Sequence, residues 1–182
     1  MEVMDVIRID LADSDPQDTE REWLETDGRG GYASSTLSGC HTRSYHGLQV
    51  SNLQSPEGRH VLLSKLEDSF LLGTGEFVFT CHRYPDVLFP PGHPLLREFL
   101  LGDIPRFSYR AGGIRMKKEV MRLPDGDTLL VRYELESSPG KGRLRLKPFL
   151  AFRGFHRLSH ENPFFPTGSN GSRKASGSIP TR

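Results

Sequence analysis

The feature that most constrains the fold is a strict alternation of apolar and polar residues in the C-terminal half of the chain. A period of two places successive side chains on opposite faces of an extended strand, so that one face is buried and the other meets water. The alternating apolar residues are Phe107, Tyr109, Ile114, Met116, Leu129, Val131, Tyr133, Leu135, Leu144 and Leu146. The sequence therefore predicts several half-buried strands in this region.

Short segments with turn chemistry separate these expected strands. They are Ala111-Gly112-Gly113, Pro124-Asp125-Gly126-Asp127 and Ser138-Pro139-Gly140-Lys141-Gly142. Glycine, proline and aspartate favour tight turns, and tight turns join antiparallel neighbours. We therefore expect an all-β fold, specifically an antiparallel β-sandwich that is either complete or lacks some of its strands.

The N-terminal half carries weaker signals of the same kind. Strands are expected at Ile7–Leu11, Gly47–Leu53, Val61–Leu72 and Glu76–His82, with Gly73-Thr74-Gly75 closing a hairpin. Surface loops are expected at Ala12–Arg21, which is polar and acidic, and at Tyr84–Pro94, which contains four prolines.

The most unusual segment, residues 23–50, is rich in glycine, small hydroxyl residues, aromatic rings and arginine. Glycine allows close backbone approach, and the planar donors and rings beside it suit a hydroxyl-rich ligand. A tight turn between strands would explain the glycines equally well. The DGRGGY sequence lacks the pattern of a phosphate-binding loop, which argues against nucleotide binding. The candidate ligand residues are Arg29, Tyr32, Arg43, Tyr45 and His46.

Residue types alone favour structural roles for the last three of these candidates. If residues 42–48 are extended, Arg43 and Tyr45 share one face and His46 lies on the other. We expect Arg43 to pair with a carboxylate and Tyr45 to pack inside the sandwich. His46 is expected to be a hydrogen-bonded structural histidine rather than an acid or base.

Composition narrows the class of partner. A formal net charge of +1 gives no electrostatic reason to expect nucleic acid or an anionic membrane. The chain has neither a long apolar run nor a signal peptide near its first residues, so a cytoplasmic protein is expected. The spacing of Cys40 and Cys81 favours two reduced thiols over a disulfide or a metal pair, and neither a metal nor a cofactor is expected.

No catalytic residue stands out. Glu67 and Asp68 are adjacent, so on a strand they would point to opposite faces and could not flank one glycosidic bond. A GxSxG nucleophile motif is missing. His156 and His160 would suit a metal only on a helix and with a third ligand, so a structural or substrate-facing role is favoured.

Several segments resemble one family in the same order along the chain. They are EWLETDGRGGYASSTLSGCHTRSYHGLQV, VLLSKLED, PRFSY and KPFLAFRGFHRLSHENP, which together span approximately Glu22–Pro163. They resemble the N-terminal domain of the bacterial and archaeal type of glycogen debranching enzyme, the amylo-α-1,6-glucosidase family. A series of matching segments is much more specific than a single glycine motif.

The resemblance implies a β-sandwich domain followed by an α/α-barrel that holds the catalytic carboxylates. It makes Arg29, Tyr32, Arg43, Tyr45 and His46 candidates for sugar contact or for the interface with that barrel. The expected partners are an α-glucan, glycogen or limit dextrin, and the barrel itself, which the sequence does not contain. Whether the chain is an enzyme by itself stays open.

The resemblance also predicts a domain at residues 1–162 and a tail at 163–182. The tail is rich in Gly, Ser and Pro, so we expect it to be disordered. We also expect it to lie outside the resemblance, which would be consistent with a truncation or a frameshift. Two alternatives remain. One is a stand-alone glucan-binding module that stacks sugars on Trp23, Tyr32 and Tyr45. The other is a non-functional fragment with open strand edges.

Overall fold

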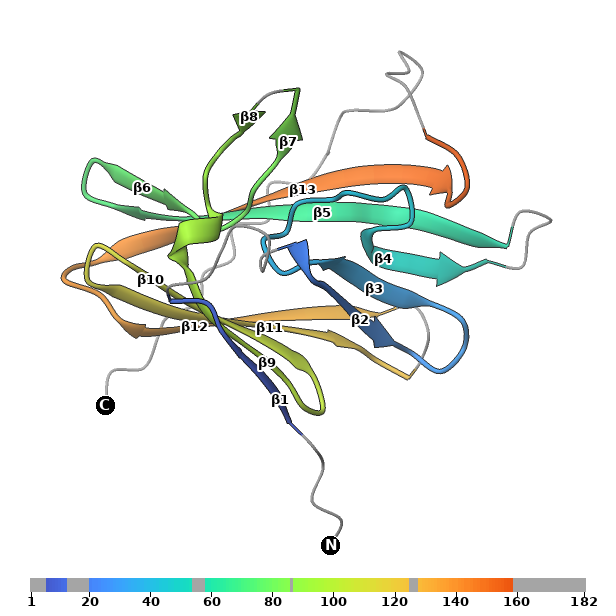
Figure 1. The fold of residues 1–182 in the computed structure, drawn as a ribbon, viewed down its shortest axis with the longest axis horizontal. Helices are drawn as coiled ribbons and strands as arrows, with labels where there is room; N and C mark the ends of the chain where they lie inside the picture. Colours follow the sequence, from blue (N-terminus) through green and yellow to red (C-terminus); the bar gives the residue numbers. More distant parts are fainter. Residues whose placement is uncertain (1–5, 13–19, 54–57, 86, 125–127, 159–182) are drawn as a thin grey trace, which may run out of the picture.

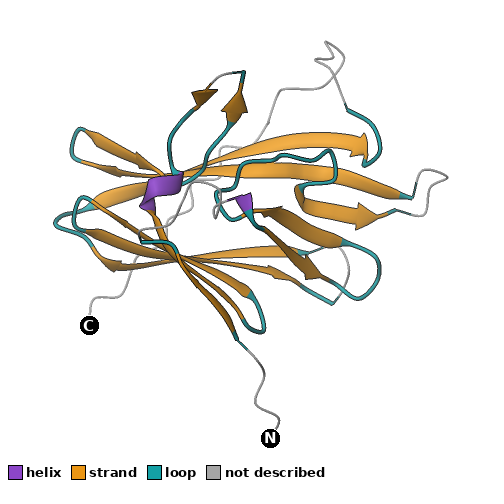
Figure 2. Cartoon of the chain, in the orientation of Figure 1, coloured by secondary structure: helices purple, strands orange, loops and turns teal. Residues whose placement is uncertain are grey.

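The computed structural model describes residues 6–12, 20–53, 58–85, 87–124 and 128–158. They form two antiparallel sheets that face each other across one core (Figures 1 and 2). The all-β sandwich is therefore confirmed. No helix long and apolar enough to cross a membrane occurs within these ranges. The expected tail at residues 163–182 lies outside the described residues.

Sheet I has the order β1-β9-β10-β11-β12. Its strands are β1 (Ile7–Asp10), β9 (Leu96–Leu101), β10 (Pro105–Ala111), β11 (Ile114–Arg122) and β12 (Leu129–Ser137). From β9 to β12 each strand pairs with the next, and a Gly112-Gly113 turn joins β10 to β11. The alternation of buried and less buried residues is complete along β11, as its sequence predicted.

Sheet II has the order β13-β5-β4-β3-β2, with β6 also paired to β5. Its strands are β2 (Glu22–Thr26), β3 (Tyr32–Thr36), β4 (Gly47–Asn52), β5 (Arg59–Leu72), β6 (Gly75–Val78) and β13 (Gly142–Gly154). The long β5 pairs with β13 along one edge and with β4 and then β6 along the other. After β12 the chain therefore leaves sheet I and completes sheet II.

Three parts of the N-terminal interpretation need correction. Strands β2, β3 and β9 were not predicted, and β6 ends at Val78 instead of His82. The expected loop at Tyr84–Pro94 contains a short ribbon, β7 (Arg83–Tyr84) with β8 (Val87–Leu88), and a 3-10 turn, η2 (His93–Leu95). The prolines are compatible with the ribbon because none of the paired residues is a proline.

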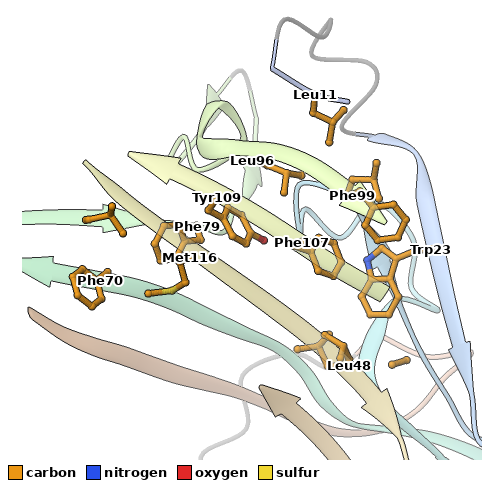
Figure 3. Packing of buried hydrophobic residues seen from close by; sticks show 14 residues of the cluster. Leu11, Trp23, Leu48, Phe70, Phe79, Leu96, Phe99, Phe107, Tyr109 and Met116 are labelled. Atoms are coloured by element: carbon orange, nitrogen blue, oxygen red, sulfur yellow. The ribbon is translucent and has the colours of Figure 1, made fainter. Parts of the chain in front are cut away.

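The core is built from rings that the two sheets direct toward each other (Figure 3). Trp23 from β2 meets Phe107 from β10 edge to face, with ring centroids 5.6 Å apart, and Phe99 lies 5.0 Å from the same Phe107 ring. Phe79 packs on Tyr109 at 4.9 Å. Burial of these rings supplies the main driving force that holds the two sheets together.

Strand β13 lies at the end of sheet II and is unusually exposed. The exposed fractions of Leu146, Phe149 and Leu150 are 42%, 42% and 59%. In the described part of the chain, β13 pairs only with β5. The edge of β13 that faces away from β5 is therefore unpaired among the described strands, as the expectation of open strand edges predicted.

Candidate functional site

The glycines of the DGRGGY sequence form the tight turn between β2 and β3. Asp27 Oδ1 accepts hydrogen bonds from the backbone N–H groups of Arg29 at 2.8 Å and Gly31 at 3.0 Å. Gly28 and Gly30 have φ values of 72° and 94°, which favour glycine. A Cβ on Gly31 would lie 2.1 Å from Asp27 Oδ2. The turn therefore explains the glycines, as the structural alternative predicted.

A buried ion pair anchors this turn to the other sheet. Arg122, the last residue of β11, places Nη2 2.9 Å from Asp27 Oδ2, and the two side chains are 0% and 1% exposed. Burial alone raises the pKa of Asp27, but the hydrogen bonds from Arg122 and from the backbone of Arg29 and Gly31 outweigh it and lower that pKa. The pair fixes β2 of sheet II against β11 of sheet I.

Arg43 and His46 both lie against Glu22. Arg43 Nε is 2.5 Å from Glu22 Oε1, and His46 Nε2 is 3.3 Å from the same oxygen. His46 Nδ1 accepts the backbone N–H of Thr42 at 3.1 Å, so the ring proton of neutral His46 lies on Nε2. Burial lowers the pKa of His46. The carboxylate partner expected for Arg43 and the hydrogen bonding expected for His46 are both present.

The position expected for Tyr45 is wrong. Residues 43–45 form a turn instead of an extended strand, with His46 N–H bonded to the carbonyl of Arg43 at 3.1 Å. The turn directs Tyr45 outward, and its side chain is 44% exposed. Its ring packs against Phe155 and His156, with centroids 5.2 and 5.6 Å away. Tyr45 is therefore a surface residue whose ring is held in place.

Polar contacts fix the orientation of this ring. The Tyr45 hydroxyl lies 3.1 Å from Nδ1 of His156, within hydrogen-bond distance. Tyr32 donates its hydroxyl proton to the Tyr45 carbonyl at 2.8 Å, so these two predicted residues are brought together. Desolvation raises the pKa of Tyr32, so this hydroxyl stays protonated at neutral pH.

Two arginines join these aromatic residues to the end of β13. Arg153 donates to the carbonyl of Ser44 at 2.6 Å and to that of Arg157 at 2.7 Å. Arg59 donates to the carbonyl of Gly30 at 2.6 Å, and its guanidinium lies 5.8 Å from the Phe155 ring centroid. In Figure 1 the end of β13 runs beside the start of β5, with which it pairs. We name this surface the aromatic–arginine patch: Tyr32, Tyr45, Arg59, Arg153, Phe155 and His156.

Comparison with known proteins places the whole segment in a family. Residues 21–180 match the family model described as glycogen debranching enzyme N terminal. The chain belongs to this family. Searches of curated proteins and of solved structures gave no match. The expectation that the resemblance ends at Pro163 is wrong, because the match continues to residue 180.

Within this debranching-enzyme N-terminal domain, sequence reasoning did not select Arg59, Arg153 or Phe155 as site residues. Phe155 and His156 stand together in the RGFH sequence, where a basic residue and two rings on the surface are the available signal. Arg29 lies in the β2–β3 turn, where its carbonyl accepts a 3.4 Å hydrogen bond from Asn52. The structure does not bring Arg29, Arg43 or His46 into the patch.

Trp23 cannot serve as a stacking platform in this fold, because its side chain is 4% exposed and fills the core. Glu67 and Asp68 point to opposite faces, as expected. Asp68 is fully buried and accepts hydrogen bonds from Lys118 and Tyr133 at 2.7 and 2.8 Å.

On the opposite face, Glu67 lies 2.6 Å from Lys147 Nζ and 2.9 Å from His82 Nε2. The hydrogen bond from Lys147 is the largest influence on the pKa of Glu67 and lowers it. Of the two histidines considered as a metal pair, His156 belongs to the patch and His160 lies outside the described residues.

Proposed function

We propose that this domain forms part of the glucan-binding site of a glycogen debranching enzyme, an α-1,6-glucosidase whose catalytic carboxylates lie in a separate α/α-barrel domain. The observation that carries the proposal is the aromatic–arginine patch, which lies beside the glycine-rich turn of the family segment. The proposed ligand is an α-glucan such as glycogen or limit dextrin.

The chemistry of the patch suits a sugar. A glucose ring presents apolar C–H groups that pack on an aromatic face and hydroxyls that require donors and acceptors. Tyr45 offers an exposed ring, and Arg59 and His156 supply polar groups beside it. Because contacts already fix the Tyr45 ring, binding would cost little side-chain entropy.

Migration in native gels that contain glycogen tests the proposal. We expect the chain to be retarded and Tyr45→Ala to raise the Kd by about tenfold, the loss of roughly 1.4 kcal/mol of ring contact. Tyr84→Ala is the matched control, since Tyr84 is 53% exposed on β7, outside the patch, and its removal should leave migration unchanged. Unretarded migration of the parent chain would reject sugar contact by this domain alone.

A separate experiment tests whether this domain binds glucan without hydrolysing it. Incubated alone with limit dextrin, the chain should release no glucose, because the proposed role is contact and not hydrolysis. Glucose release above the blank would show that this chain holds a catalytic centre.

The second candidate, a stand-alone glucan-binding module, is favoured by the same patch, because all its residues come from this one chain. The two functions differ in their dependence on the catalytic domain. A module binds glycogen equally well with and without that domain, whereas a shared site binds more tightly once the domain is added. If the patch is instead the interface between the domains, Tyr45→Ala will weaken capture of the catalytic domain and leave glycogen migration unchanged.

A further inference from the structure

Two cysteines that are distant in the sequence meet in the fold. Cys40 lies in the connection between β3 and β4, and Cys81 follows β6; both are buried and carry free thiols. Their segments lie side by side, since a Cβ on Gly39 would be 3.5 Å from Cγ2 of Thr80. The Cys40 and Cys81 thiols influence each other's pKa. The two cysteines therefore lie on adjacent backbone segments, close enough for their thiols to interact.

A buried lysine fixes the two segments relative to each other. Lys65 on β5 donates from Nζ to the carbonyl of Gly39 at 3.1 Å and to that of Cys81 at 3.2 Å. The same Nζ lies 3.3 Å from Nδ1 of His82. The ammonium group thus bridges the backbone at both cysteines and places a positive charge close to both thiols.

This environment favours a thiolate on one of the two cysteines. The neighbouring Cys81 thiol is the largest influence and, together with the charges of Lys65 and Arg83, lowers the pKa of Cys40 against the opposing effect of burial. The interaction with Cys40 raises the pKa of Cys81. Cys40 therefore loses its proton more readily than Cys81 does. The thiolate is the form that attacks electrophiles.

We propose that Cys40 and Cys81 are a modification site at which a peroxide forms a reversible intramolecular disulfide. The Cys40 thiolate attacks one oxygen of hydrogen peroxide, which breaks the O–O bond, gives a sulfenic acid and releases hydroxide that takes up a proton as water. The Cys81 sulfur then attacks the sulfenic sulfur, and its proton leaves with the hydroxyl group as a second water. The two cysteines lose two electrons, and the peroxide gains them.

The bond would act on the connection that carries Tyr45. It would tie the β3–β4 connection to the segment after β6, which closes a covalent loop through residues 40–81. The inference does not depend on glucan binding, because it uses only the contacts among the two cysteines and Lys65.

Intact-mass analysis of the native full chain tests the proposal. The reduced protein is treated with a small excess of hydrogen peroxide, quenched with catalase, denatured and alkylated. We expect a product lighter than the reduced chain by about 2 Da that takes up no alkyl group, because two hydrogens have left the thiols. Dithiothreitol should restore two alkylatable thiols, and a tryptic digest should contain the linked Cys40 and Cys81 peptides.

Cys40→Ser and Cys81→Ser are the controls, since each leaves one thiol in the chain. Neither variant should show the mass loss, and circular dichroism should show that both remain folded. A parallel oxidation in guanidinium chloride should be slower, because the native contacts are lost there. The proposal is overturned if the native wild-type chain keeps two alkylatable thiols, if it only gains oxygen, if it only forms interchain bonds, or if the unfolded chain forms the disulfide faster.

Discussion

Asp27→Ala is the substitution most revealing of how the glycine-rich turn is held. It removes the carboxylate that pairs with Arg122 and that accepts the backbone N–H groups of Arg29 and Gly31. Because both charged side chains are almost completely buried, the substitution leaves the guanidinium without its carboxylate partner in the interior.

The structure sets the expected magnitude. Removing one partner of a buried ion pair costs about 3–5 kcal/mol, because the remaining charge stays desolvated. The exposed pair of Arg8 and Glu98 is a matched control: its atoms are 2.5 Å apart, but the Arg8 side chain is 70% exposed. Arg8→Ala should therefore cost less than about 1 kcal/mol. The two expected losses in free energy of unfolding therefore differ because of burial and not because of contact length.

Urea unfolding followed by far-ultraviolet circular dichroism gives the free energies of unfolding. In a double-mutant cycle, Asp27→Ala with Arg122→Ala should cost less than the sum of the two single losses, because the double variant leaves neither charge buried. If Asp27→Ala stays within about 1 kcal/mol of wild type, or if the two single effects simply add, the buried pair does not anchor the turn.

Two further predictions concern the same turn. The lowered pKa of Asp27 means that its stabilisation is complete above the ordinary aspartate pKa and is lost as pH falls through the lower folded value. The gap in free energy of unfolding between wild type and Asp27→Asn should therefore shrink below about pH 4, and a gap that stays constant into stronger acid would contradict the pairing. Gly31→Ala should cost about 2 kcal/mol or more in urea unfolding, because its Cβ would meet Asp27 Oδ2 at 2.1 Å. Gly102→Ala, with ordinary contact at 3.6 Å, should change stability little, and equal losses at the two sites would refute the steric argument.

The sequence predicted most securely the strands in which apolar and polar residues alternate. Along β11 the buried positions alternate without a break, so periodicity alone was sufficient. Strand β3 was missed because its buried residues include Ser35 and Thr36, which carry no apolar signal. Their burial follows from the sheet that covers them, and that packing is decided by residues distant in the chain.

The candidate site shows the same limit. The pairing of Arg43 with a carboxylate could be expected from residue type, but the outward turn of Tyr45 could not, because neither glycine nor proline marks residues 43–45. The contact of Arg153 with the Ser44 carbonyl joins residues 109 positions apart. The pairing of β13 with β5, and of β5 with β4, brings them together, so no local pattern could have predicted the patch.

The most direct test of the proposed glucan contact is a titration of the isotope-labelled chain with a linear maltooligosaccharide, followed by amide NMR shifts. The predicted result is that the largest saturable shifts occur at Tyr45 and at Phe155 and His156, and that they disappear in Tyr45→Ala. Saturable shifts confined to sheet I, or no shifts at millimolar sugar, would contradict a glucan-binding role for the aromatic–arginine patch.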